Sequence, residues 1–254
     1  SQITGVLFIL KIQINFVLFL RILLVGNVKS GKSSAGNTIL GRKRFAFKLN
    51  RAVDSLMREG NVADRKITVV EAPGWWPDRP VEKSTEMLKQ EIVLSVSECP
   101  PGPHAVLAVV NGDRMFRKND REILEGYLML LGDKVWNHTI VLFTFMDTLG
   151  NTTIERHIES EGEDLQWLVE KCQNRYHVFN IQKKDDDIQV KELLEKIEEI
   201  VMITEKGCYH FEKVPKTLRR VEDHLPPSKN ISVGGLAIFI YLSSWTKARK
   251  STIT

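Results

Sequence analysis

The sequence predicts an α/β fold of three layers, in which helices cover both faces of a mostly parallel central sheet. Short apolar runs of strand length alternate with longer stretches whose apolar residues recur at helical spacing. A glycine-rich motif follows one of the apolar runs and precedes a helical stretch. Such alternation is typical of α/β proteins, because each helix carries the chain back so that the next strand can run parallel to the last.

The strands and helices can be placed along the chain from these patterns. The predicted strands cover Arg21–Val25, Lys66–Val70, His104–Val110, His138–Phe145 and Tyr176–Asn180. The predicted helices cover Ser33–Leu40, Val81–Val96, Asp120–Leu131, Ile154–Cys172 and Val190–Ile203. Ligands of such sheets bind beyond the carboxyl ends of the strands, and every candidate motif comes at or just after the end of a predicted strand.

Composition excludes several classes of protein. The 254 residues include 36 lysines and arginines against 32 aspartates and glutamates, so the net charge is +4. This balance is too mild for a nucleic-acid-binding protein, and no basic cluster is interleaved with aromatic residues. The three cysteines are scattered without metal-ligand spacing, which indicates reduced thiols in a cytosolic protein.

Both ends of the chain lie outside this pattern. Residues 1–19 form an apolar extension, and three interpretations stay open: an added strand, a membrane anchor, or a start foreign to the functional protein. Residues 20–204 make up the α/β domain. Residues 205–254 form a tail with an apolar stretch at Gly234–Trp245, which is either a buried segment or one that associates with a membrane surface.

The strongest motif is the P-loop at Gly26–Ser33, which fits the pattern G-x-x-x-x-G-K-[ST]. Its glycines let the backbone curl so that successive N–H groups point at phosphate oxygens, and the following helix adds its N-terminal dipole. Lys32 is expected to neutralise the β- and γ-phosphates, and the Ser33 hydroxyl to ligate Mg²⁺. The predicted phosphate-binding residues are Gly26, Asn27, Val28, Lys29, Ser30, Gly31, Lys32, Ser33 and Ser34.

A second motif, Glu71-Ala72-Pro73-Gly74, directly follows the second predicted strand. GTPases usually carry Asp-x-x-Gly here, where the acid holds Mg²⁺ through water and the glycine N–H meets the γ-phosphate. Glu71 is one methylene longer than aspartate and still reaches a metal-bound water. The alternative is a plain turn at the end of a strand, since Pro-Gly is common there.

Four segments together resemble the immunity-associated GTPases, the GIMAP or IAN family: GNVKSGKSSAGNTILG, EAPGWW, LSVSECPPGPHAVLAVV and YHVFN. The likeness covers roughly residues 21–204, is strongest to fish members that carry EAPGWW, and is most specific at Pro101–His104. It implies a P-loop NTPase of the G-domain type that binds GTP or GDP with Mg²⁺ in the cytoplasm. It also implies slow hydrolysis, self-association across the switch surface, and in many members a membrane-associating C-terminus.

The base-binding segment departs from this family. After Leu142-Phe143-Thr144 the chain reads Phe145-Met146-Asp147-Thr148, which lacks the family's basic residue. Asp147 is our candidate for the carboxylate that accepts hydrogen bonds from the guanine N–H groups. Phe145 either stacks on the base or packs in the core. Asn180 matches the asparagine with which the family contacts the base, although it is also a common turn residue.

The switch regions lack the usual hydrolytic groups. Ala52 stands where related sequences often carry threonine, and Trp75 and Trp76 follow Gly74 where a water-orienting glutamine is common. Slow or partner-dependent turnover is therefore expected, and the two tryptophans form either an oligomer surface or part of the core. The leading hypothesis is a guanine-nucleotide switch. A non-hydrolysing scaffold that assembles on itself or on membranes is the alternative, and an adenine-specific enzyme is a third.

Overall fold

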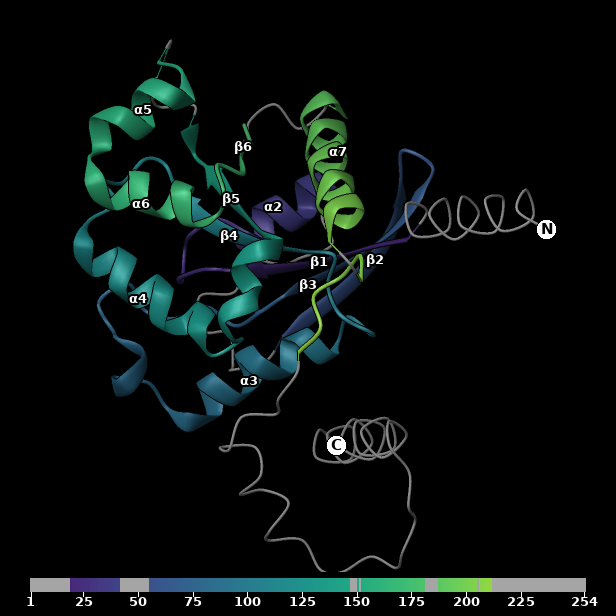
Figure 1. Cartoon of the computed structure of the whole chain (residues 1–254), viewed down its shortest axis with the longest axis horizontal. Coiled ribbons are helices and arrows are strands. Elements are labelled where there is room, and N and C mark those ends of the chain that lie inside the picture. The colour runs from purple at the N-terminus through teal and green to yellow at the C-terminus, as the bar shows by residue number, and fades with distance from the viewer. Residues whose placement is uncertain are drawn as a thin grey trace, which may run out of the picture. The chain divides into compact units, whose positions relative to one another are not determined.

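The computed structural model describes residues 19–41, 55–146, 150, 152–180, 187–204 and 206–211 (Figure 1). Three sequence predictions lie outside these residues: the N-terminal extension, most of the C-terminal tail, and the candidate base contact Asp147. Ala52 also lies outside them. Among the described residues, no helix is long and apolar enough to cross a membrane.

A six-stranded sheet with the order β2-β3-β1-β4-β5-β6 forms the centre of the fold. Every neighbouring pair runs parallel except β2 and β3, which are antiparallel, so the predicted α/β class is confirmed. The strands are β1 (Phe19–Val25), β2 (Leu56–Val62), β3 (Arg65–Glu71), β4 (Ala105–Asn111), β5 (Thr139–Thr144) and β6 (Tyr176–Val178).

Helices cover both faces of this sheet. They are α2 (Lys32–Ile39), α3 (Glu86–Ser97), α4 (Lys118–Met129), α5 (Ile154–Glu161), α6 (Glu163–Lys171) and α7 (Asp187–Ile203), with short 3-10 helices at η1 (Val81–Lys83) and η2 (Asp133–His138). Helices α2 and α7 share one core cluster with alternate residues of β1, such as Ile22 and Leu24. Helices α3 and α4 lie on the other side of the sheet (Figure 1).

The sequence patterns misplaced some boundaries. The edge strand β2 was not predicted, because LMREGNV carries charged and glycine residues and alternates between half-buried and exposed positions. The helix predicted from Val81 begins at Glu86, because the Thr85 hydroxyl accepts a hydrogen bond from the Leu88 N–H and so caps it there. The helix predicted over 154–172 divides at Gly162, whose φ of 99° lies outside the helical range.

The position of β1 explains where a ligand would bind. Its two neighbours, β3 and β4, are reached by connections that leave in opposite directions, which makes the carboxyl end of β1 the topological switch point of the sheet. The P-loop begins there, at Gly26. The backbone therefore places the motif where open α/β sheets bind their ligands.

The Pro101–His104 box lies at the opposite end of the sheet and has a structural role. The Arg21 N–H donates to His104 Nδ1 over 2.9 Å, and the Arg21 Nε donates to the Gly102 carbonyl over 2.7 Å. The Tyr209 N–H donates to the Pro103 carbonyl over 2.8 Å, and any side chain at Gly102 would collide with the Tyr209 carbonyl. The box thus anchors β1 and the segment that follows α7.

Two buried histidines should make folding sensitive to acid. Burial lowers the pKa of His104 to about 3, with nearby Arg21 and His138 adding to the effect, and burial lowers the pKa of His177 to about 4. Both imidazoles are neutral in the fold and protonate near pH 6.5 once unfolded, so the unfolded state binds more protons below that pH. The free energy of unfolding should therefore fall as pH drops from 6.5 to 4.5.

We expect a slope of up to ~1.4 kcal/mol per pH unit for each histidine in this window. Urea unfolding at pH 7, 6 and 5 measures it, and proton uptake on unfolding should be visible in weakly buffered solution. An unfolding free energy that stays flat between pH 6.5 and 5 would contradict the assignment of both groups as neutral.

Candidate functional site

The P-loop curls around the side chain of its own lysine. Gly26 and Gly31 have φ values of 154° and 95°, which side chains rarely adopt. The Lys32 ammonium donates to the Gly26 carbonyl over 2.9 Å and to the Asn27 carbonyl over 2.8 Å. Lys32 is 6% exposed and is the first residue of α2. The charge is therefore held at the mouth of the loop, next to the N-terminus of a helix.

Thr144, which was not among the predicted site residues, holds the P-loop from one side. The Thr144 hydroxyl, at the end of β5, donates to the Ser30 carbonyl over 2.7 Å. A side chain at Gly31 would approach the same hydroxyl within 2.9 Å, so glycine is needed there for contact as well as for conformation. The family-like run Leu-Phe-Thr contained this residue, but its pattern gave no sign of a link to the P-loop.

Ser33 and Glu71 meet at the carboxyl ends of β1 and β3. The Ser33 hydroxyl donates to Glu71 Oε1 over 2.8 Å, and Glu71 is 5% exposed. Adjacent ligands of an octahedral Mg²⁺ lie about 2.9 Å apart, because each sits 2.0–2.1 Å from the metal. The pair therefore fits two neighbouring positions around Mg²⁺. The described part of the chain has no group of three or more acidic, histidine or cysteine side chains that could hold a metal ion, so phosphate and water would supply the other ligands.

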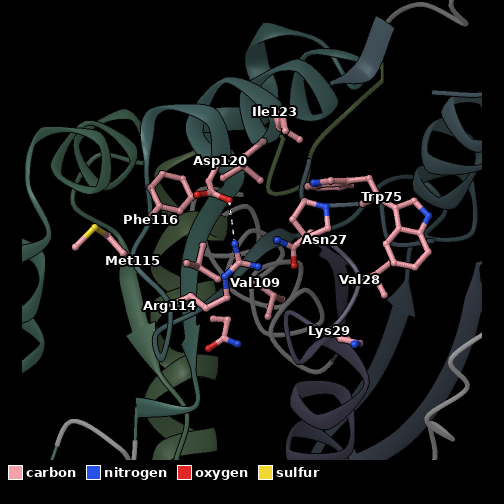
Figure 2. Close-up of a pocket in the computed structure, with 16 residues that line it drawn as sticks. Asn27, Val28, Lys29, Trp75, Val109, Arg114, Met115, Phe116, Asp120 and Ile123 are labelled. Carbon is pink, nitrogen blue, oxygen red and sulfur yellow. Dashed lines mark ion pairs between the residues drawn. The ribbon is translucent and has the colours of Figure 1, made fainter. Parts of the chain in front are cut away.

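The segment after β3 lies directly on the P-loop (Figure 2). The Val28 N–H donates to the Trp75 carbonyl over 2.6 Å, and Asn27 and Trp75 form an isolated parallel bridge. A side chain at Gly74 would approach Lys32 Nζ within 2.8 Å. Gly74 thus lies beside the lysine, and its contact with a γ-phosphate stays a prediction.

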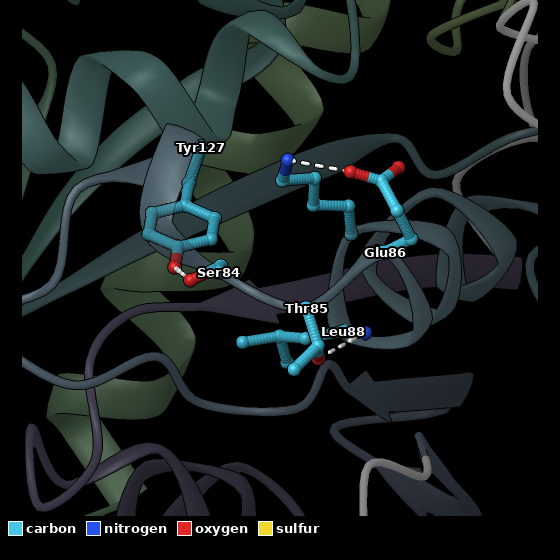
Figure 3. A network of polar contacts seen from close by, with 6 residues as sticks. Ser84, Thr85, Glu86, Leu88 and Tyr127 are labelled. Atoms are coloured by element: carbon cyan, nitrogen blue, oxygen red, sulfur yellow. Dashed lines mark hydrogen bonds and ion pairs between the residues drawn. The ribbon is translucent and has the colours of Figure 1, made fainter.

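The two tryptophans have different environments. Trp75 is 2% exposed and stacks on Tyr127 of α4, with 4.3 Å between the ring centroids and 10° between the planes. The Tyr127 hydroxyl in turn hydrogen-bonds the Ser84 hydroxyl (Figure 3), and burial raises the pKa of Tyr127. Trp76 is 50% exposed. Packing therefore explains Trp75, and only Trp76 of the pair is available to a partner.

Two of the predicted base contacts, Phe145 and Asn180, follow β5 and β6. They therefore lie at the carboxyl end of the parallel strands, as the P-loop does. Phe145 adopts a φ of 58°, unusual for a residue with a side chain, and its ring lies against Gly31. The next residue, Met146, packs its sulfur against Gly112. The Asn180 N–H donates to Gln189 Oε1 over 3.0 Å, which ties the end of β6 to α7. Apolar side chains therefore border this part of the site.

Sequence comparisons place the chain among known nucleotide-binding proteins. The model of the AIG1 family matches residues 20–228. The human GTPase IMAP family member 8 is 32% identical over 200 residues, which cover 76% of this chain and 28% of that protein. The immune-associated nucleotide-binding protein 12 of Arabidopsis thaliana is also 32% identical over 200 residues, covering 73% of this chain and 49% of that protein. The chain thus spans half or less of these relatives.

Solved structures agree on the fold. Toc33 from Arabidopsis thaliana in complex with GDP and Mg²⁺ superposes with a TM-score of 0.60 at 14% identity, covering 80% of this chain and 91% of that chain. Era from Aquifex aeolicus gives a TM-score of 0.50 at 16% identity, with 70% and 56% covered. The fold is therefore that of a P-loop G domain.

The Trp75–Tyr127 stack predicts that two adjacent substitutions destabilise the fold to very different extents. Trp75→Ala removes a buried indole beside the P-loop and should lower the free energy of unfolding by about 3–5 kcal/mol. Trp76→Ala truncates a half-exposed indole and should cost less than about 1 kcal/mol. Urea denaturation of both variants measures the difference. Equal costs would contradict the packing described for Trp75.

Proposed function

The chain belongs to the AIG1 family, and on this basis we propose that residues 20–204 act as a guanine-nucleotide switch. In this proposal the domain binds GTP and GDP together with Mg²⁺ and hydrolyses GTP slowly or only with a partner. The observation that carries it is the Lys32 ammonium, held by the Gly26 and Asn27 carbonyls beside the Ser33–Glu71 pair. Cation, metal ligands and helix N-terminus converge there as a bound triphosphate requires.

Each part of the site has a defined role in this proposal. Lys32 would neutralise the β- and γ-phosphates, while Ser33 and Glu71 would hold Mg²⁺, directly or through water. When bound, Mg²⁺ would offset the negative charge between the phosphates. Within Asn27–Ser34 the Val28 N–H is donated to the Trp75 carbonyl, and other N–H groups of the loop would cradle the phosphates, while Gly74 would sense the γ-phosphate. Phe145, Asp147 and Asn180 would contact the base.

Slow turnover is supported by the residue that comes directly after Gly74. Hydrolysis needs a group that orients the attacking water and another that stabilises charge on the γ-phosphate. Trp75 has no hydrogen-bond acceptor on its side chain, and its indole is buried against Tyr127. It therefore cannot orient water as a glutamine would. This chain would accordingly bind the nucleotide, and a partner would accelerate its hydrolysis.

Self-association in the GTP state and contact with a membrane surface belong to the same proposal. Trp76, Met87 and Met115 are exposed by 50%, 63% and 55%, and a second copy of the chain would bury apolar surface by covering them. The Toc33 structures include one described as a dimerization-deficient mutant. The apolar stretch at residues 234–245 and its basic flank would bring the tail to anionic lipid from the cytoplasm.

A non-hydrolysing scaffold is the alternative. Three residues favour it: Glu71, the buried Trp75, and Ala52, which stands where related sequences often carry threonine. Each replaces a group common in active GTPases. Single-turnover assays with γ-labelled GTP separate the two functions. Phosphate release that exceeds the rate without protein, and that Lys32→Ala abolishes, rules out the inert scaffold.

Removal of the P-loop cation should abolish nucleotide binding without unfolding the domain. Lys32→Ala eliminates the charge that faces the phosphates, so we expect affinity for GTP and GDP to fall by about 100-fold or more. Lys118→Ala, on the exposed start of α4, is the matched control and should bind as the unaltered chain does. Calorimetric titration with GTP, GDP and ATP measures both variants. Binding retained by Lys32→Ala, or equal affinity for ATP and GTP, would refute the proposal.

The base contact can be tested by exchanging acceptor for donor. Guanine offers two donors to a carboxylate, whereas xanthine offers one donor and one acceptor, which match a carboxamide. Asp147→Asn should therefore weaken GTP and strengthen XTP, each by about tenfold or more. Asp133→Asn is the control, since Asp133 is exposed at the start of η2. If Asp147→Asn keeps the original preference for GTP over XTP, Asp147 does not read the base.

A further inference from the structure

A cavity of about 340 Å³ lies beside the P-loop, and Asn27, Val28 and Lys29 form part of its lining (Figure 2). It is bounded by the first four residues of the P-loop, the segment after Gly74, the end of β4 and the start of α4. It shares Gly26–Lys29 with the candidate nucleotide site. Lys32, Ser33, Glu71, Phe145 and Asn180 do not line it. The cavity therefore borders the candidate phosphate site along Gly26–Lys29 but does not include its lysine, its metal ligands or the described base contacts.

Most of the residues that line this cavity are apolar, and packing holds several of them in place. Val109 belongs to the central strand β4 and is 3% exposed, while Ile123 and Leu124 belong to α4 and are 3% and 5% exposed. Trp75 is fixed by its stack on Tyr127. Phe116 is held by its N–H, which donates to Glu161 Oε2 over 2.9 Å. Packed elements thus keep an apolar hollow open, as preformed small-molecule sites require.

The mouth of the cavity carries charge with an excess of cations. Lys29 and Arg114 line it together with one acid, Asp120. The Arg114 guanidinium approaches Asp120 Oδ1 only to 3.7 Å, and the other Asp120 oxygen accepts a hydrogen bond from the Arg117 N–H over 3.0 Å. Asp120 is thus engaged by the cap of α4, and Arg114 is 55% exposed on its side chain. A guanidinium in this position suits a bidentate contact with a carboxylate or sulfonate.

We propose that this cavity is a second ligand site, for a small amphipathic anion with an aromatic or branched aliphatic body and one anionic group. The body would occupy the hollow between Trp75, Val109 and α4, and the anionic group would pair with Arg114. The volume is at the small end of ligand cavities, which suits one or two fused rings. The proposal does not depend on nucleotide binding.

The site would also influence the nucleotide switch. The Trp75 carbonyl accepts the Val28 N–H, so the same residue forms a wall of the cavity and a contact of the P-loop. A ligand against the indole would therefore bias the arrangement of residues 74–77, and nucleotide and anion affinities would shift by the same factor.

The probe for this site is 8-anilinonaphthalene-1-sulfonate, whose emission rises in an apolar environment. We expect saturable binding with one molecule per chain. Arg114→Glu reverses the charge at the mouth and should weaken binding at least about tenfold, as should Met115→Glu, which places an anion on the rim. Met129→Glu is the matched control, because Met129 is an exposed methionine of α4 that does not line the cavity. Its binding should match the unaltered chain within about twofold.

The Lys32→Ala variant distinguishes this site from the nucleotide site. It should bind the probe normally, whatever its affinity for GTP. Probe binding that Arg114→Glu and Met115→Glu leave unchanged, that Met129→Glu weakens equally, or that Lys32→Ala abolishes would overturn the proposal. Circular dichroism of each variant establishes that it is folded. If Arg114→Glu does not fold, Arg114→Ala takes its place, with an expected loss of affinity of about fivefold.

Discussion

The P-loop is held between two neighbouring segments, and the rest of the site depends on this constraint. On one side the Thr144 hydroxyl donates to the Ser30 carbonyl, and on the other the Trp75 carbonyl accepts the Val28 N–H. Between them the Lys32 ammonium is fixed by two loop carbonyls. The loop therefore does not have to be organised by a ligand, and a pre-arranged cation loses little entropy when phosphate binds.

Trp75 connects this loop to the helical layer. Its backbone contacts the P-loop, its indole stacks on Tyr127, and Tyr127 reaches Ser84 just before α3. A change in the phosphate site would thus be transmitted to α3 and α4 through packed aromatic groups rather than through a flexible loop. The same residue stands where a water-orienting glutamine is common, so the proposed slow turnover and the proposed coupling would both depend on Trp75.

Sequence alone predicted the α/β class, the P-loop and most strands, because buried parallel strands are apolar along their whole length and the motif has fixed glycines. It missed β2, whose edge position lets charged residues occur in a strand. It also missed Thr144 and Tyr127, since their roles come from contacts between segments far apart in the chain. The Pro101–His104 box was the most specific part of the resemblance to the family. Its position at the far end of the sheet could be found only from the structure.

In the proposed switch, nucleotide binds at the P-loop and acts on the segment that carries Trp75. Hydrogen exchange followed by mass spectrometry, with and without GTP and Mg²⁺, tests it most directly. We expect slower exchange in peptides that cover residues 26–34, together with a change in those that cover 71–85, and unaltered exchange in the 206–211 segment at the opposite end of the sheet. Unchanged exchange across residues 26–34 at saturating GTP would contradict it.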